Sequence, residues 1–140
     1  MNKLKPYSAS LLALSGVLIT GMGLYFIFIR PPLLPEDLHY MKTTSSIVQD
    51  SIPGLSIWLQ KVFLVMGGYI FTSGLVILFI ARTSFRKREG GSFSIATISG
   101  ISSIGLMTVV NFIIESDFKI TLLVFALVWV ASIVLYLFHK

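Results

Sequence analysis

Two carboxylates and a histidine lie close together in the segment RPPLLPEDLHYM, residues 30–41. Glu36 and His39 are three positions apart, so a helix would present both on one face, and such carboxylate–histidine pairs hold metals in helical bundles. Glu115 and Asp117 would add oxygen ligands from a second loop. A second matching pair is missing, however, and acids in a first helical turn are already explained by the helix dipole. We therefore predict no metal site.

A second polar pair lies near the end of a long apolar run, where Asn111 and Glu115 are one helical turn apart. Polar side chains at membrane depth face protein or a water-filled cavity, and ionisable ones are candidates for function. We favour Asn111 as an interhelical hydrogen bonder, with a ligand contact as the alternative. If a ligand site exists, we expect it at the outer mouth of the helices, lined by Glu36, Asp37, His39, Tyr40, Asn111 and Glu115.

The elements that would position these residues are membrane helices. The 140-residue chain is 55% hydrophobic and 12% charged, with a mean hydropathy of +0.89, whereas soluble domains are roughly 25% charged. Four apolar runs are long enough to cross a bilayer, which takes roughly 20 helical residues: 8–29, 62–81, 93–114 and 120–138. We predict an all-α, four-helix membrane bundle forming a single domain, residues 1–140.

The basic residues predict the orientation. One side of the predicted bundle carries Lys3, Lys5, the basic loop 82–92 and Lys140, and the positive-inside rule makes that side cytoplasmic. Both termini are therefore expected on the cytoplasmic side of a bacterial inner membrane. The net charge of +5 does not indicate nucleic-acid binding, because the basic loop lies directly beside two membrane helices. We expect that loop to set topology and touch anionic headgroups, with a dedicated lipid site as the alternative.

Prolines divide the outer connection, residues 30–56, into an expected cap over the bundle. Pro31 and Pro32 end the first membrane helix, because proline does not continue a helix and restricts the residue before it. Pro35 suits the first turn of a new helix, in which acids complement the dipole. Apolar residues recur every three or four positions from Leu34. We predict a short amphipathic helix in this loop.

Small residues predict how the helices associate, since membrane helices pack closely where side chains are small. We expect packing roles for Gly16, Gly67, Gly74, Ser99, Gly100 and Ser103. The third helix is richest in such residues, so we place it at the centre of the tightest contacts. The glycine faces also permit a homo-oligomer, and the alternative to packing is that they make room for a ligand.

Missing residue types exclude several functions. The chain has no cysteine, so thiol redox chemistry and thiolate metal sites are excluded. A haem-carrying bundle needs histidines at membrane depth, but His39 and His139 lie outside the spans. No span interior holds an acid, which argues against a proton-coupled exporter. We therefore expect no cofactor.

The layout resembles small bacterial four-helix membrane proteins of the DoxX-like kind. The resemblance lies in four closely spaced spans, a longer first outer connection and the glycine-rich second helix VFLVMGGYIFTSGLVILFIA. It implies no catalytic residue. We favour a non-enzymatic protein that binds a lipid-like small molecule or a partner membrane protein. The alternative is a small membrane enzyme acting on an apolar substrate at the outer mouth, with Glu36, His39 or Glu115 in acid–base roles.

Overall fold

The computed structural model describes residues 5–138, and within that range every regular element is a helix. The elements are α1 (Lys5–Phe28), α2 (Pro35–Tyr40), α3 (Ser45–Ser51), α4 (Leu55–Ile80), η1 (Ala81–Phe85), α5 (Ser92–Gly100), η2 (Ile101–Gly105), α6 (Leu106–Ile113) and α7 (Lys119–Phe138). Lys3, His139 and Lys140, which entered the sequence predictions, lie outside the described residues.

Four continuous helical segments are long and apolar enough to cross a membrane, which confirms the predicted all-α four-helix bundle. They are Tyr7–Phe28, Leu55–Phe85, Ser92–Ile113 and Lys119–Phe138. The second begins at Leu55 rather than at Val62, because the helix starts directly after the Pro53–Gly54 turn. The connection between the first two membrane helices is residues 29–54, close to the predicted 30–56.

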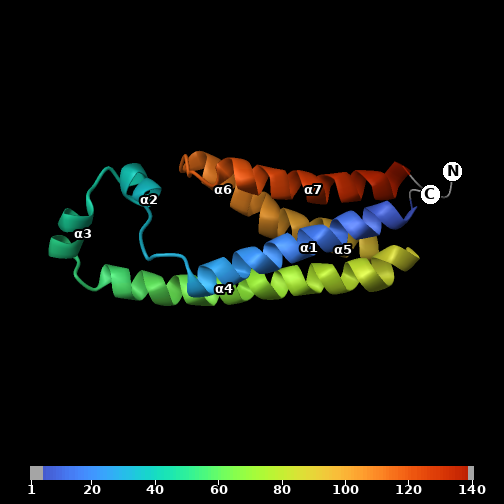
Figure 1. Ribbon diagram of the computed structural model, residues 1–140, viewed down its shortest axis with the longest axis horizontal. Helices are drawn as coiled ribbons and strands as arrows, with labels where there is room; N and C mark the ends of the chain where they lie inside the picture. The colour runs from blue at the N-terminus through green and yellow to red at the C-terminus, as the bar shows by residue number, and fades with distance from the viewer. Residues whose placement is uncertain (1–4, 139–140) are drawn as a thin grey trace.

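The molecule is elongated, and the helices run along its length (Figure 1). The start of α1 and the end of α7 lie at one end, here called the terminal end, together with the η1–α5 connection. The opposite end, here called the capped end, carries the α6–α7 turn and the cap, defined as residues 29–54 with helices α2 and α3. Towards the capped end, α6 and α7 diverge from α1 and α4 (Figure 1).

Helix α1 is the centre of the bundle, packing along α4 on one side and α7 on the other. The expectation that the third membrane helix makes the tightest contacts is therefore wrong. That helix packs mainly against α7, and α6 makes little direct contact with α4. The small residues of the third helix are numerous, but several face gaps between helices rather than a neighbouring backbone.

A seam of glycines holds α1 against α4. A Cβ added at Gly16 would lie 2.7 Å from the backbone nitrogen of Leu78, and one at Gly67 would lie 2.8 Å from Cγ1 of Ile27. A Cβ at Gly74 would collide with the backbone nitrogen and hydroxyl of Thr20. Close backbone approach of this kind is how membrane helices gain dispersion energy. The packing roles expected for these three glycines agree with the geometry.

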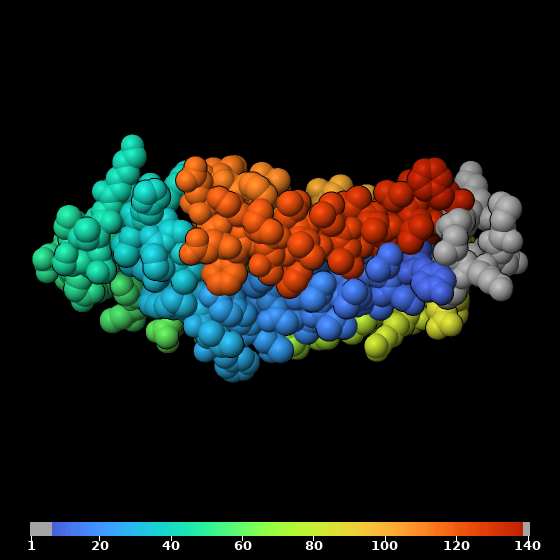
Figure 2. Space-filling model, turned by 45° about the horizontal axis from the view of Figure 1, so that its top comes forward, coloured from blue at the N-terminus to red at the C-terminus, as the bar shows by residue number. Residues whose placement is uncertain are grey.

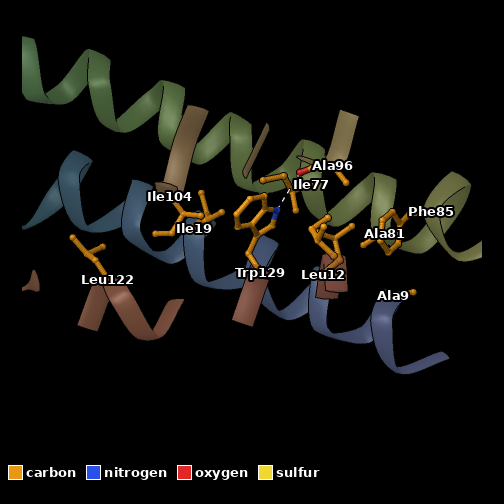
Figure 3. Close-up of a cluster of buried hydrophobic side chains, with 11 residues drawn as sticks. Ala9, Leu12, Ile19, Ile77, Ala81, Phe85, Ala96, Ile104, Leu122 and Trp129 are labelled. Carbon is orange, nitrogen blue, oxygen red and sulfur yellow. Dashed lines mark hydrogen bonds between the residues drawn. The ribbon is translucent and has the colours of Figure 1, made fainter. Parts of the chain in front are cut away.

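Helix α7 is joined to the third membrane helix through Trp129 (Figure 3). Its indole N–H donates a 3.1 Å hydrogen bond to the Ala96 carbonyl, and its ring lies where a side chain on Gly100 would have to be. Two further interhelical bonds involve α7: the Thr108 hydroxyl donates to the Leu122 carbonyl at 3.2 Å, and the Ser132 hydroxyl donates to the Ser8 carbonyl at 2.8 Å. Such bonds fix the rotation of α7 in an otherwise apolar interface.

The cap folds back onto the bundle. Pro35 occupies the first turn of α2, as predicted, and the Asp37 carboxylate accepts a 2.9 Å hydrogen bond from the backbone N–H of Leu34 just before that helix. Figure 2 shows the cap lying against α1 and the α6–α7 turn. Helix α3 was not predicted as a helix; its start is capped by Thr44, and Val48 is its buried residue.

Candidate functional site

A cavity of about 520 Å³ lies at the capped end, between α1, α4 and the η2–α6 part of the third membrane helix. This volume falls within the roughly 300–1,000 Å³ typical of small-molecule sites. Apolar and aromatic side chains form most of its wall, including Met22, Phe63, Ile70 and Met107. The cavity follows from the bundle geometry, because α6 diverges from α4 where the glycine seam keeps α1 and α4 together.

The cavity is open on the side that faces lipid. Three of its lining residues, Tyr69, Leu106 and Val110, are 74%, 57% and 50% exposed. They belong to α4 and α6, so the opening runs between these two helices. A smaller groove continues from it along α4 and α5, and Tyr69, Ser73 and Ser102 line both. A molecule dissolved in the bilayer therefore has a lateral route into the cavity.

Polar side chains converge on the cavity at the capped end. Arg30, at the end of the first membrane segment, forms a 3.0 Å ion pair with Asp37 of α2, and its side chain is only 8% exposed. The guanidinium carbon lies 3.5 Å from the ring centroid of Phe63, which is close enough for a cation–π contact. Arg30 and Asp37 thus neutralise each other over an aromatic surface, while both line the cavity.

Glu36 makes the second polar contact between the cap and the bundle. Its Oε1 accepts a 3.0 Å hydrogen bond from the hydroxyl of Ser116, which lies in the α6–α7 turn and is 1% exposed. The Ser116 hydroxyl also accepts the backbone N–H of Phe118 at 3.1 Å. Glu36 and Ser116 both line the cavity, so α2 bridges the end of α1 and the α6–α7 turn at its capped end.

The structure brings together three of the six predicted ligand residues. Glu36, Asp37 and Asn111 line the cavity. The Asn111 amide donates a 2.8 Å bond to the Met107 carbonyl of its own helix, so the favoured interhelical bond through this group is not made. The other three predicted residues, His39, Tyr40 and Glu115, are exposed and do not line the cavity.

Glu115 has a conformational role that explains its position. It has a φ of +55°, and the N–H groups of Glu115 and Ser116 donate to the carbonyls of Phe112 and Asn111 at 3.3 and 2.9 Å. This is the Schellman pattern that ends a helix with a left-handed residue, a place usually taken by glycine. The carboxylate is carried away from the cavity as a result.

His39 and Tyr40 lie on the part of α2 that turns away from the bundle. Because α2 has only six residues, the positions facing the bundle are those anchored by Glu36 and Asp37. Among residues 5–138, no group of three or more His, Asp or Glu side chains is arranged to hold a metal ion. Glu115 and Asp117 are thus not placed to add ligands to the Glu36–His39 pair.

Sequence reasoning missed Arg30, Ser116 and the π-helical turn η2. In η2 the N–H of Leu106 donates to the Ile101 carbonyl, which is the wider spacing of a π turn, and such turns are frequent at functional sites. Ser102 and Ser103 of this turn line the cavity. Ser99 and Ser103, for which packing roles were expected, are half-buried, and the Ser103 hydroxyl donates a hydrogen bond to the Ser99 carbonyl within the third helix.

The chain matches no protein-family model, and no curated protein or solved structure shows significant similarity to it. The resemblance to DoxX-like membrane proteins therefore stays a prediction.

Proposed function

We propose that this protein is an integral membrane protein that binds an amphipathic, lipid-like small molecule. The observation that carries this proposal is the cavity of about 520 Å³, which is apolar along most of its length, polar at the capped end and open between α4 and α6. Small-molecule sites combine a mainly apolar wall with a few polar groups that orient the ligand. This cavity has that composition.

The opening of the cavity between α4 and α6 favours a ligand that approaches from the bilayer. An apolar chain moving sideways between α4 and α6 exchanges lipid contacts for protein contacts, so it loses little solvation on the way. Its polar end would meet Arg30, Glu36 and Asn111 near the membrane surface rather than in the hydrocarbon. Polar groups at the bilayer centre are costly, and this arrangement avoids that cost.

The basic residues at the terminal end support an orientation in which the cap lies outside a bacterial inner membrane. Arg82, Arg86 and Lys87 are exposed at the terminal end, and Arg88 donates a 3.1 Å bond to the Tyr136 carbonyl. Short loops rich in basic residues remain on the cytoplasmic side. The cavity would then be filled from the outer leaflet.

The test is native mass spectrometry of protein released from membranes in mild detergent, followed by identification of retained molecules. Val110→Trp introduces an indole into the cavity opening, whereas Val109→Trp places one on the neighbouring lipid-facing surface. The two valines are similarly exposed, at 50% and 56%, so the pair is matched. We expect a stoichiometric amphiphile in the wild type and Val109→Trp, and its loss in Val110→Trp. Protein that never retains such a molecule would refute the proposal.

A further inference from the structure

Charge at the polar end of the cavity is unbalanced. Two acids, Glu36 and Asp37, and one base, Arg30, line it. Asp37 is paired with Arg30 at 3.0 Å. Within residues 5–138, Glu36 forms no ion pair with a basic side chain, and its hydrogen-bond partner is the neutral hydroxyl of Ser116. Among the described residues, the charged lining residue without an opposite charge as its partner is therefore an acid, Glu36.

Aromatic rings lie at the same end as this carboxylate. Tyr25 and Phe118 both line the cavity, and their ring centroids are 5.7 Å apart. Phe118 is connected to Glu36 through Ser116, whose hydroxyl accepts from the Phe118 N–H and donates to Glu36. A carboxylate and aromatic rings at the same end of a cavity suit an ammonium group, because the carboxylate offers the opposite charge and the electron-rich ring faces attract cations.

Arg30 does not provide a matching site for an anion. Its guanidinium donates to Asp37 and to the Pro31 carbonyl, and it lies over Phe63 and Phe26. An anionic head that bound Arg30 would share this base with Asp37 and at the same time approach the unpaired carboxylate of Glu36. Charge repulsion and desolvation both oppose that arrangement.

We infer that the ligand is a single-chain amphiphile with an ammonium head, held by Glu36 beside Tyr25 and Phe118. This inference rests on the proposed binding function and specifies its ligand class. The apolar tail lies along Met22, Ile70 and Met107 towards the opening between α4 and α6. A cavity of about 520 Å³ suits one chain rather than a two-chain phospholipid. The ammonium can belong to a free long-chain amine or to the ethanolamine head of a single-chain lipid.

The experiment compares three twelve-carbon probes that differ only in their heads: dodecylammonium, dodecanol and dodecanoate. Equilibrium binding is measured for the full chain in an uncharged sugar detergent, which contains no competing ammonium, and is corrected for empty micelles. We expect dodecylammonium to bind at least roughly tenfold more tightly than dodecanoate, the size of effect given by hydrogen bonds to charged groups. Lysophosphatidylethanolamine is then added as a competitor. Displacement indicates a lipid source and its absence a free amine, and both results uphold the ammonium head.

Two variants separate the charge from the shape of the site. Glu36→Gln keeps an oxygen that accepts from Ser116 but removes the charge, so it should bind dodecylammonium and dodecanol with similar affinity. Glu115→Gln removes an exposed acid outside the cavity and should keep the wild-type preference. Equal or tighter binding of dodecanoate, or a preference that survives in Glu36→Gln, overturns the inference while leaving the binding function intact. Failure of all three probes to bind overturns both.

Discussion

The hydroxyl of Ser116 donates a 3.0 Å hydrogen bond to Glu36, a residue 80 positions earlier in the chain. This bond joins α2 to the α6–α7 turn on one side of the cavity, while the ion pair between Arg30 and Asp37 joins α2 to the end of α1 on the other. The cap is thus held at two points, and the cavity lies between them. Each attachment can be removed separately.

Replacing Ser116 with alanine should loosen the cap without unfolding the bundle. The substitution removes the bond to Glu36 and leaves the Phe118 N–H without its acceptor, a loss of about 1–2 kcal/mol. Hydrogen exchange of the amides of α2 should become faster. Ser51→Ala, at an exposed position at the end of α3, is the matched control. Unchanged exchange in α2 would mean that this bond does not hold the cap.

Replacing Arg30 alone with methionine should destabilise the protein more than replacing both Arg30 and its partner Asp37. The single variant leaves the Asp37 carboxylate, which is 19% exposed, without its base, and breaking such a pair costs about 3 kcal/mol. The double variant Arg30→Met/Asp37→Leu should recover most of this loss, because no unpaired charge remains. Thermal unfolding in detergent, followed by tryptophan fluorescence, measures both. A double variant no more stable than the single one would contradict this account.

Two glycines of α4, one inside the seam and one outside it, test the packing seam. Gly74→Ala should destabilise the bundle by about 1–3 kcal/mol, because its methyl group would collide with the backbone of α1 at Thr20. Gly68→Ala should be neutral or stabilising by up to about 1 kcal/mol, since nothing lies within 4 Å of the added carbon and alanine favours the helix. Unfolding in a denaturing detergent titration compares them. Similar midpoints for both variants would argue against the seam.

The left-handed conformation of Glu115 predicts a stabilising substitution. Glu115→Gly should raise stability by about 1 kcal/mol, because glycine adopts a φ of +55° without the steric cost of a Cβ. Asp117→Gly is the control, since Asp117 is not in that conformation and should gain no such benefit. Thermal unfolding distinguishes the two. The same two variants also test whether the Glu115 carboxylate matters for binding, because ligand retention measured by native mass spectrometry should be unaffected in both.

The absence of cysteine allows the proposed orientation to be measured directly. Gln49→Cys on α3 and Lys87→Cys at the terminal end place single thiols at exposed positions of opposite ends. In intact cells, a membrane-impermeant maleimide should label the first, and the second should react only after permeabilisation. The reverse pattern would place the cap in the cytoplasm.

The helices and the cap could be predicted because their signals are local. Span length and hydropathy are properties of neighbouring residues, and Pro31 and Pro35 act on the backbone where they stand. The second span was predicted from residue 62 because Leu55 to Lys61 contains polar residues; the helix itself begins at Leu55, since a helix that extends beyond the hydrocarbon tolerates them.

The cavity was harder to predict because its polar groups meet only after folding. Arg30 was not predicted as a site residue, yet α2 brings Asp37 back onto it. Ser116 is a single serine between two acids, and its partner lies in the first loop. Glu115 looked like a ligand candidate by its spacing from Asn111, but helical periodicity cannot apply where the helix ends in a left-handed residue.

The π turn η2 determines the direction, around the helix axis, in which the later side chains of the third membrane helix point. A π turn is equivalent to one residue inserted into an α-helix, and one residue corresponds to a rotation of about 100°. Beyond η2, Thr108 faces α7 while Asn111 and Met107 face the cavity. Shortening Ile101–Gly105 by one residue would rotate these side chains together without altering their chemistry. The length of the chain at this turn, as much as its composition, determines which residues line the cavity.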